Sequence, residues 1–308
     1  MEEKTRWLKV DDGVEIFIKS WESTQKPKAI IQIAHGMAEH IERYHEFAKF
    51  FVTKGFLVVG NDHRGHGKTG EKEGRLGYLA DEEGFERAVD DLRAVNLMIK
   101  EEFPKARIFL MGHSMGSFFV RRYIQKYANS IHGAIISGTG GNPRIGGKIG
   151  KWIAKREIKK RGRMAESPTI QRLIFGSYNK KFKDDSSPFA WLTRDTEIVK
   201  TYMNDPFCGF TCTSGFFYDL FTGLETIHQD ENIRKIPNDF PMFIFSGEQD
   251  PVGGNTKGVK KVIRQYEKNG LTNIQSMFFP KGRHEMLNEL NKEDVYEHIF
   301  HWIENQIK

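Results

Sequence analysis

A serine flanked by glycines is the feature of this chain that most restricts its fold. Residues Gly112–Gly116 read Gly-His-Ser-Met-Gly. They follow the apolar, strand-like stretch Arg107–Met111 and precede Ser117–Ile124, where apolar residues recur at helical spacing. A turn this tight leaves no room for a Cβ atom on either side of the serine. The pattern predicts a nucleophile elbow that exposes the Ser114 hydroxyl at a sheet edge; a purely structural turn is the alternative.

Strand-like and helix-like stretches alternate along most of the chain. Strands are expected at Val14–Ser20, Ile30–Ala34, Phe56–Val59, Arg107–Met111, Ile131–Ser137, Met242–Ser246 and Ile274–Phe279. Helices are expected at Glu39–Lys54, Phe85–Glu102, Gly258–Lys268 and Asp294–Gln306, and directly after the elbow. This alternation predicts an α/β fold with a mostly parallel central sheet flanked by helices. Gln32 is the one polar side chain in this segment, so the pattern predicts a strand at Ile30–Ala34 but leaves its full burial open.

The alternation stops between Gly138 and about Thr226, and the charge changes there too. Residues 141–226 hold 15 Lys and Arg against 9 Asp and Glu, whereas the rest of the chain holds 32 of each. We therefore expect an inserted helical cap at 141–226. It would separate a first part of the α/β core, 1–140, from a second part, 227–308.

A serine hydroxyl is a weak nucleophile and needs a base, which in turn needs an orienting group. Asp250 follows the strand at Met242–Ser246, and His284 follows the strand at Ile274–Phe279. Open α/β sheets place their sites at these carboxyl ends. We expect His284 to be the base and Asp250 the acid, with Glu248 as the rival acid. His298 and His301 lie in the C-terminal amphipathic stretch and are expected to be surface or packing residues.

Acyl transfer also develops a negative charge on the substrate oxygen, which hydrogen-bond donors stabilise. The backbone N–H of Met115, directly after the serine, is the expected first donor. The loop after Ile31–Ala34 would supply the second, with the Met37 N–H preferred. The alternative for His35 and Gly36 in this loop is a plain strand-to-helix turn.

Four segments together resemble the monoacylglycerol lipase and lysophospholipase branch of the α/β-hydrolases, a serine aminopeptidase S33-like group. They are His35–His40, Asn61–Gly67, Gly112–Gly116 and Gly282–Glu285, and Leu192–Leu224 also resembles the cap of that branch. The resemblance implies an α/β-hydrolase fold with Ser114 as nucleophile, Asp250 as orienting acid and His284 as base. It implies no cofactor. Ser117 stands where such relatives have a further glycine, a change that bears on helix packing more than on chemistry.

These observations predict a serine carboxylic-ester hydrolase of the carboxylesterase and lipase type. Its expected substrates are esters like monoacylglycerols or lysophospholipids. The alternatives are an aminopeptidase-like amide hydrolase, which the basic cap disfavours, and a non-catalytic ligand-binding homologue. A serine at the elbow excludes the epoxide and haloalkane chemistry that needs an aspartate there. The residues expected to contact substrate are His35, Gly36, His113, Phe207 and Phe217.

Asp62, His63 and His66 lie close together and could be mistaken for a metal cluster, but the resemblance implies a structural loop, so no metal is expected. Cys208 and Cys212 lack companion zinc ligands and are expected to be free thiols in a reducing cytoplasm. The N-terminus has no basic start followed by an apolar stretch, so we expect no signal peptide. No apolar run reaches the length that crosses a bilayer.

Lys148–Arg163 carries eight basic residues and one acid. Ile145, Ile149, Trp152 and Ile153 share one face of a helix there, with lysines to one side, as in helices that lie on anionic membranes. We expect either weak peripheral contact with the inner face of the membrane or a solvated cap face over the protein's own core. Nucleic-acid binding is not expected, because no recognisable module accompanies the charge.

Overall fold

Eight strands form one sheet within residues 1–182 and 187–308, which the computed structural model describes; residues 183–186 of the expected cap lie outside the described residues. The strands are β1 (Glu2–Lys9), β2 (Glu15–Glu22), β3 (Ile30–Ala34), β4 (Leu57–Asn61), β5 (Ile108–His113), β6 (Gly133–Ser137), β7 (Met242–Gly247) and β8 (Ile274–Phe279). Their order in the sheet is β1-β2-β4-β3-β5-β6-β7-β8. The pairs β1–β2 and β2–β4 are antiparallel and all others are parallel, so the expected mostly parallel α/β fold is confirmed.

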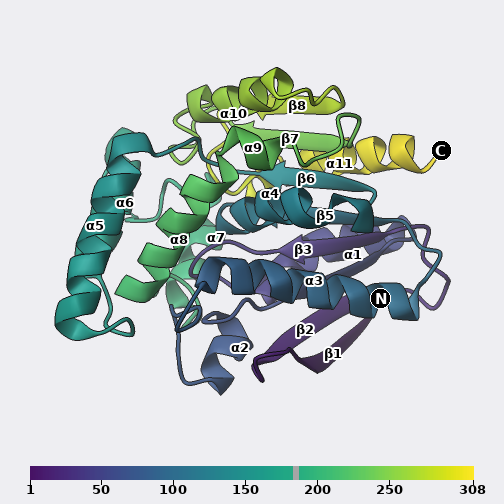
Figure 1. The fold of residues 1–308 in the computed structure, drawn as a ribbon. Helices are drawn as coiled ribbons and strands as arrows, with labels where there is room; N and C mark the ends of the chain where they lie inside the picture. The colour runs from purple at the N-terminus through teal and green to yellow at the C-terminus, as the bar shows by residue number, and fades with distance from the viewer. Residues whose placement is uncertain (183–186) are drawn as a thin grey trace.

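Helices cover both faces of this sheet (Figure 1). They are α1 (His45–Thr53), α2 (Gly67–Lys72), α3 (Gly84–Glu102), α4 (Met115–Tyr127), α5 (Arg144–Arg161), α6 (Pro168–Phe175), α7 (Thr196–Asn204), α8 (Ser214–Ile227), α9 (Asp230–Ile233), α10 (Lys257–Lys268) and α11 (Lys292–Ile307). Alternate residues of β5 point to opposite faces of the sheet and join two different cores. Ile108 and Leu110 join the core under α3, α4, α8 and α10, whereas Phe109 and Met111 join the core under α1 and α11.

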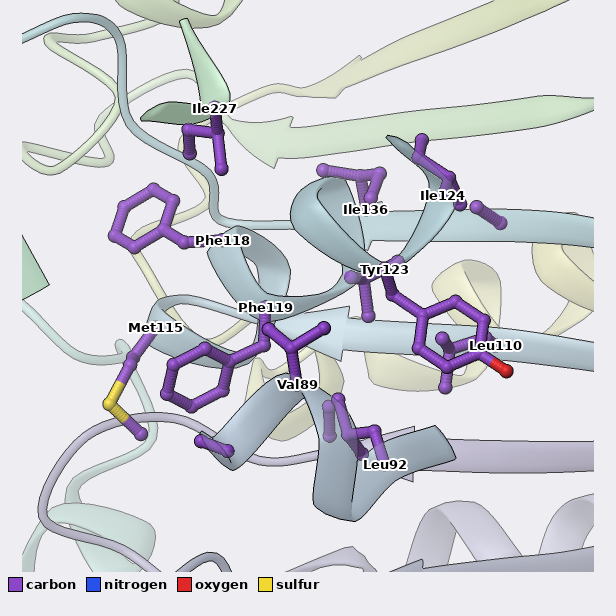
Figure 2. Close-up of a cluster of buried hydrophobic side chains, with 14 of the residues drawn as sticks. Val89, Leu92, Leu110, Met115, Phe118, Phe119, Tyr123, Ile124, Ile136 and Ile227 are labelled. Atoms are coloured by element: carbon purple, nitrogen blue, oxygen red, sulfur yellow. The ribbon is translucent and has the colours of Figure 1, made fainter. Parts of the chain in front are cut away.

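The helix after the elbow, α4, is held in the larger of the two cores. Figure 2 shows Phe119 of α4 between β5 and α3, close to Val89 and Leu92. The Phe119 side chain is fully buried, and its ring lies 4.9 Å from that of Phe85 in α3. Because burying such a side chain stabilises by about 1.5–3 kcal/mol, this contact fixes where α4 starts and hence where the elbow lies.

The strands expected from the sequence are all present, and the one that was missed is β1. It lies at the sheet edge, paired with β2 along its whole length. Its sequence, Glu-Glu-Lys-Thr-Arg-Trp-Leu-Lys, is charged at most positions and therefore lacks the apolar alternation of a buried strand. Charged edge strands of this kind resist pairing with other chains.

Two further expectations are refined by tertiary contacts. Gln32 in β3 is fully buried because its amide donates to Leu92 O (2.9 Å) and accepts from Asn96 Nδ2 (3.2 Å). The helix expected over Glu39–Lys54 is shorter at its start: a 3-10 turn spans Ile41–Tyr44, and α1 follows. Residues before this turn form a loop instead.

Between β6 and β7 the chain leaves the sheet and forms α5 to α9. The buried face of α5 consists of Gly147, Gly150 and Ala154, which let the helix approach α8 closely. A Cβ atom on Gly150 would lie 2.4 Å from the ring of Phe221 in α8. None of the helices in the described part of the chain is both long and apolar enough to span a bilayer.

The segment after β4 forms a buried loop in which histidine rings pack together. His35, His63 and His66 are fully buried, and the His35 and His63 ring centroids lie 4.2 Å apart. The His63 N–H donates to His35 Nε2 (3.0 Å). The Asp62 carboxylate instead accepts from the N–H groups of Ile41 and Lys68. These contacts tie the loop to its surroundings as a structural element.

We predict that the protein loses stability as the pH falls below about 6.5, the ordinary pKa of histidine. Burial lowers the pKa of His63 to about 3 and that of His66 to about 4. Below pH 6.5 the unfolded chain binds protons that these folded rings do not, so each ring costs roughly 1.4 kcal/mol per pH unit until its folded pKa is reached. Urea unfolding at a series of pH values from 7.5 to 4.5 measures this slope.

Buried aspartates act in the opposite direction, since burial raises the pKa of Asp62 and of Asp91 to about 6. The measured slope should therefore be smaller than the histidines alone would give. Substituting His63 by asparagine should flatten it, and substituting the exposed His301 should not. A free energy of unfolding that stays constant from pH 7.5 to 4.5 would contradict this account.

Candidate active site

Ser114 lies at the turn between β5 and α4 in a conformation that few non-glycine residues adopt. Its φ is 52° and its ψ is −118°, which places the side chain at the tip of the turn. A Cβ atom on Gly112 would lie 2.4 Å from Gly116 O, and one on Gly116 would lie 2.0 Å from Ala34 O. Both glycines are therefore required by direct backbone contact, as the sequence pattern indicated.

The loops after β7 and β8 bring an acid and a histidine to this serine. His284 Nε2 lies 2.9 Å from Ser114 Oγ, and His284 Nδ1 lies 3.0 Å from Asp250 Oδ1. Asp250 is fully buried and also accepts from Ser246 Oγ and the Val252 N–H. Glu248, the rival acid, lies exposed on the same loop. The structure thus brings Ser114, His284 and Asp250 into one hydrogen-bonded chain.

The surroundings of His284 favour its protonated form. Burial alone would lower the pKa of the ring, but the Asp250 charge and hydrogen bond outweigh burial and raise the pKa above 6.5. The Glu285 and Glu39 carboxylates add to this rise. A base of this kind can accept the serine proton and then hold it as an imidazolium.

A cavity of about 140 Å³ opens onto the serine. One wall comes from the core, with Gly36, Met37 and His113. The other comes from the segment between β6 and β7 and is mainly apolar, with Phe175, Phe189, Trp191, Leu192 and Tyr202. The Trp191 ring lies 5.1 Å from the His284 ring, so this segment also covers the base.

The two expected oxyanion donors are both near the nucleophile. Met37 lines the cavity, and Gly36 beside it is so close that a Cβ atom there would lie 3.3 Å from Ser114 Cβ. Met115 is the first residue of α4, where the N–H groups have no intrahelical acceptor. No backbone carbonyl of the described residues accepts from the N–H of Met37 or Met115.

Only some of the residues expected to contact substrate line the cavity. Gly36 and His113 line the cavity, whereas His35 is buried behind it in the histidine cluster. Phe207 lines a separate groove beside Tyr78, and Phe217 is fully buried in the core on α8. The structure does not bring these two phenylalanines to the serine.

Several residues of the site carried no recognisable signal in the sequence. Phe175, Phe189 and Trp191 come from a stretch without clear periodicity, so only the folded structure shows that they line the same cavity as Ser114. Glu285 was detectable as the neighbour of His284, but its partner Arg43 is 242 positions away.

One group of possible metal ligands lies among the described residues: His40, Asp205 and Cys208. His40 Nε2 is already 2.8 Å from Asp205 Oδ2. Burial raises the pKa of the Cys208 thiol and so disfavours the thiolate that a metal would need. The arrangement is that of a histidine–carboxylate pair linking two loops.

The elbow, the sheet order and the hydrogen-bonded serine, histidine and aspartate define an α/β-hydrolase. The family model described as serine aminopeptidase, S33, matches residues 25–291. The chain therefore belongs to this family, and the expected branch of the α/β-hydrolases is confirmed.

Known relatives are named for ester hydrolysis. The monoacylglycerol lipase of Mycolicibacterium smegmatis is 26% identical over 294 residues, which cover 94% of this chain and 93% of that protein. The monoglyceride lipase of Homo sapiens is 40% identical over 105 residues, 34% of this chain and 33% of that protein. Among solved structures, a thermostable carboxyl esterase from Bacillus coagulans, in complex with glycerol, has a TM-score of 0.92 at 27% identity, covering 100% of both chains. The expectation of a serine hydrolase of the carboxylesterase and lipase type is confirmed.

We predict that kcat/KM rises with pH through an apparent pKa above 6.5. His284 must be neutral to accept a proton, and Asp250 raises the pKa of its ring. Initial rates on a soluble ester from pH 5 to 9 would measure this limb, and Asp250→Asn should lower both the rate and the apparent pKa. A limb at or below pH 6 in the wild-type enzyme would contradict the assignment of His284 as base.

Proposed function

We propose that the protein hydrolyses carboxylic esters with an apolar acyl group, such as monoacylglycerols or lysophospholipids, through an acyl-enzyme on Ser114. The observation that carries this proposal is the relay from Ser114 Oγ to His284 to Asp250 at the floor of a mainly apolar cavity. Relatives named as monoacylglycerol lipase and as phospholipase support the substrate class.

In this mechanism His284 Nε2 takes the Ser114 proton while Oγ attacks the ester carbonyl carbon. Asp250 holds the His284 Nδ1–H and stabilises the imidazolium. The N–H groups of Met37 and Met115 stabilise the oxyanion, and the imidazolium then gives its proton to the leaving alcohol. Water then attacks the carbonyl carbon of the acyl-enzyme while His284 accepts its proton. The bond between Ser114 Oγ and the acyl group breaks, His284 returns the proton to Oγ, and the carboxylic acid product is released.

The size of the cavity bears on the acyl chain. An apolar cavity of about 150 Å³ in another protein holds one benzene molecule, so about 140 Å³ accommodates a short acyl group. A long-chain monoacylglycerol would require outward displacement of the wall formed by Phe175, Phe189 and Trp191. We propose residues 141–226 as the cap that makes this movement, over core parts 1–140 and 227–308.

Ester cleavage is favoured over the aminopeptidase alternative by the charges at the cavity. Recognition of a free amine needs an unpaired carboxylate. Glu39 and Glu285 line the cavity, but both are ion-paired with Arg43. The apolar wall offers no replacement among the described residues. A non-catalytic binding role is disfavoured because the complete relay, with its hydrogen bonds, would have no use.

The outer face of α5 supports a second proposal, peripheral contact of this otherwise cytoplasmic enzyme with anionic membrane surfaces. Ile145, Ile149 and Trp152 are 74%, 49% and 57% exposed, because the small residues of α5 face α8. Ile153, the fourth member of this stripe, is instead partly buried against the core, so the stripe is divided between solvent and the protein's own core. Figure 1 shows α5 at an outer edge of the molecule. Several cations on α5 have no carboxylate partner among the described residues: Lys148, Lys155, Arg156, Lys159 and Lys160.

We predict that p-nitrophenyl esters are hydrolysed with a maximum at short to medium acyl chains, and that Ser114→Ala abolishes the activity. The reason is the volume of the cavity together with its apolar wall. A series from acetate to palmitate measures the preference, and a fluorophosphonate probe should label only the wild-type serine.

Phe189→Ala should enlarge the cavity and shift the maximum toward longer chains. Phe207→Ala is the matched control, since Phe207 lines a different groove. If the preferred acyl-chain length changed in Phe207→Ala but not in Phe189→Ala, the proposal that the cavity binds the acyl chain would be contradicted. Aminopeptide hydrolysis without ester hydrolysis would reverse the choice of substrate class.

We predict salt-sensitive binding to vesicles that contain phosphatidylglycerol, because each cation near such a surface contributes about 1 kcal/mol at low salt. Trp152→Ser should weaken co-sedimentation several-fold. Leu97→Ser, which removes a 49% exposed side chain on α3, is the matched control. Equal binding by both variants, or no binding at low salt, would end this proposal.

A further inference from the structure

A buried ion cluster outside the serine–histidine–aspartate relay connects two loops of the site. Arg43 donates to both Glu285 oxygens, at 2.8 and 2.7 Å, and to Glu39 Oε2 at 2.5 Å. The side chains are 11% exposed for Arg43 and 4% for each glutamate. Burial opposes charge here, yet Arg43 holds the pKa of Glu285 well below its ordinary value. One guanidinium therefore joins the carboxylates of two loops.

Each carboxylate belongs to a loop that carries part of the catalytic machinery. Glu39 Oε1 accepts from the Gly36 N–H, directly before Met37, and from the Tyr44 hydroxyl at 3.0 Å. Glu285 directly follows His284. Arg43 thus spans from the loop of the Met37 N–H to the loop of the histidine base.

The proposed cap also contacts the loop Gly36–His40, which carries the Met37 N–H and is called the oxyanion loop below. The carbonyl of Ala38, a residue with φ of 51°, accepts from the Gly209 N–H (3.0 Å) and the Tyr202 hydroxyl (3.1 Å). The Tyr202 ring lies 4.8 Å from the Arg43 guanidinium. His40 and Asp205 add a hydrogen bond of 2.8 Å between the loop and the residues after α7. Residues 202–209 therefore contact both the loop and the ion cluster.

We infer that Arg43 is a positioning residue that fixes the oxyanion loop relative to the His284 loop, and that Tyr202 makes this arrangement depend on the seated cap. This inference rests on the proposed function of Ser114 and His284. Arg43 does not line the cavity, so its effect on catalysis is exerted through Glu39 and Glu285. A bidentate arginine holds both partners in one plane, which a lysine cannot do.

The cluster also sets the charge near the base. The charged and titratable groups that act on His284 are Asp250 from the β7 loop, Glu285 from its own loop, Glu39 from the oxyanion side and His113 from β5. Arg43 is paired with the two glutamates. The two glutamates and Arg43 together contribute one net negative charge. Removing the charge of Glu285 should therefore make His284 a weaker base, whereas a lysine at Arg43 should not.

Two variants separate geometry from charge. Arg43→Lys keeps the charge but loses the bidentate contact, so we expect kcat on p-nitrophenyl acetate to fall at least tenfold with little change in KM and no shift of the acidic limb. Glu285→Gln keeps the shape but loses the charge, so the acidic limb of kcat/KM should move to lower pH by roughly half a unit. Asp219→Asn is the control, because it removes a buried partner of Arg163 outside the site.

Rates are normalised to the folded fraction from urea unfolding and to active sites titrated with a fluorophosphonate. Normalised kcat for Arg43→Lys equal to that of Asp219→Asn would overturn the positioning role, and an unmoved limb in Glu285→Gln would overturn the electrostatic one. If the wild-type protein hydrolyses no ester, the proposed function fails by itself. The inference is then tested by the rate of fluorophosphonate labelling of Ser114 in the same variants.

The cap contribution has its own pair of variants. Tyr202→Phe removes one of the two donors to the Ala38 carbonyl, and we expect a severalfold fall in kcat for a small soluble ester. Tyr123→Phe is matched, because it also removes one buried hydroxyl, which contacts Ser130 at 2.6 Å far from the site. Equal kcat for these two variants would overturn the dependence of the oxyanion loop on the cap.

Discussion

The close backbone contact at the elbow is the constraint on which the rest of this site depends. Gly116 lies directly against Ala34, so α4 starts beside the end of β3 and the loop that follows β3 passes next to Ser114. The strained conformation of Ser114 is maintained because Phe119 and its neighbours anchor α4 in the core. Without this contact, neither the Met37 N–H nor the histidine loop would have a fixed position relative to the serine.

The segment between β6 and β7 also determines the geometry of the site, because it both covers His284 and holds its loop by hydrogen bonds. Trp191 lies against the His284 ring, and the Trp191 and Leu192 carbonyls accept from the N–H groups of His284 and Glu285. Tyr202 contacts the opposite loop. The sheet loops and the segment between β6 and β7 therefore form the site jointly, and a change in this segment reaches His284 as well as the cavity.

Much of this was accessible from the sequence because the relevant patterns are local. Ser114 directly follows β5, and Asp250 and His284 lie in the loops after β7 and β8, so a parallel sheet brings them to one edge. The local pattern was misleading at two places: it did not predict β1, and it left open the full burial of the predicted strand β3. The charged β1 is stable because β2 pairs with it, and the fully buried Gln32 is tolerated because Asn96 and Leu92 satisfy its amide.

The sequence by itself determined the alternation of strands and helices, the elbow and the three residues of the relay, since these follow from periodicity and from steric limits within a few residues. The tertiary structure alone decided which side of α5 faces outward, which aromatic side chains meet the serine and which two glutamates share Arg43. Those outcomes depend on contacts between residues far apart in the chain, such as Gly150 with Phe221 and Arg43 with Glu285. No local pattern encodes such partners, because many side chains of similar size and charge could satisfy the same spacing.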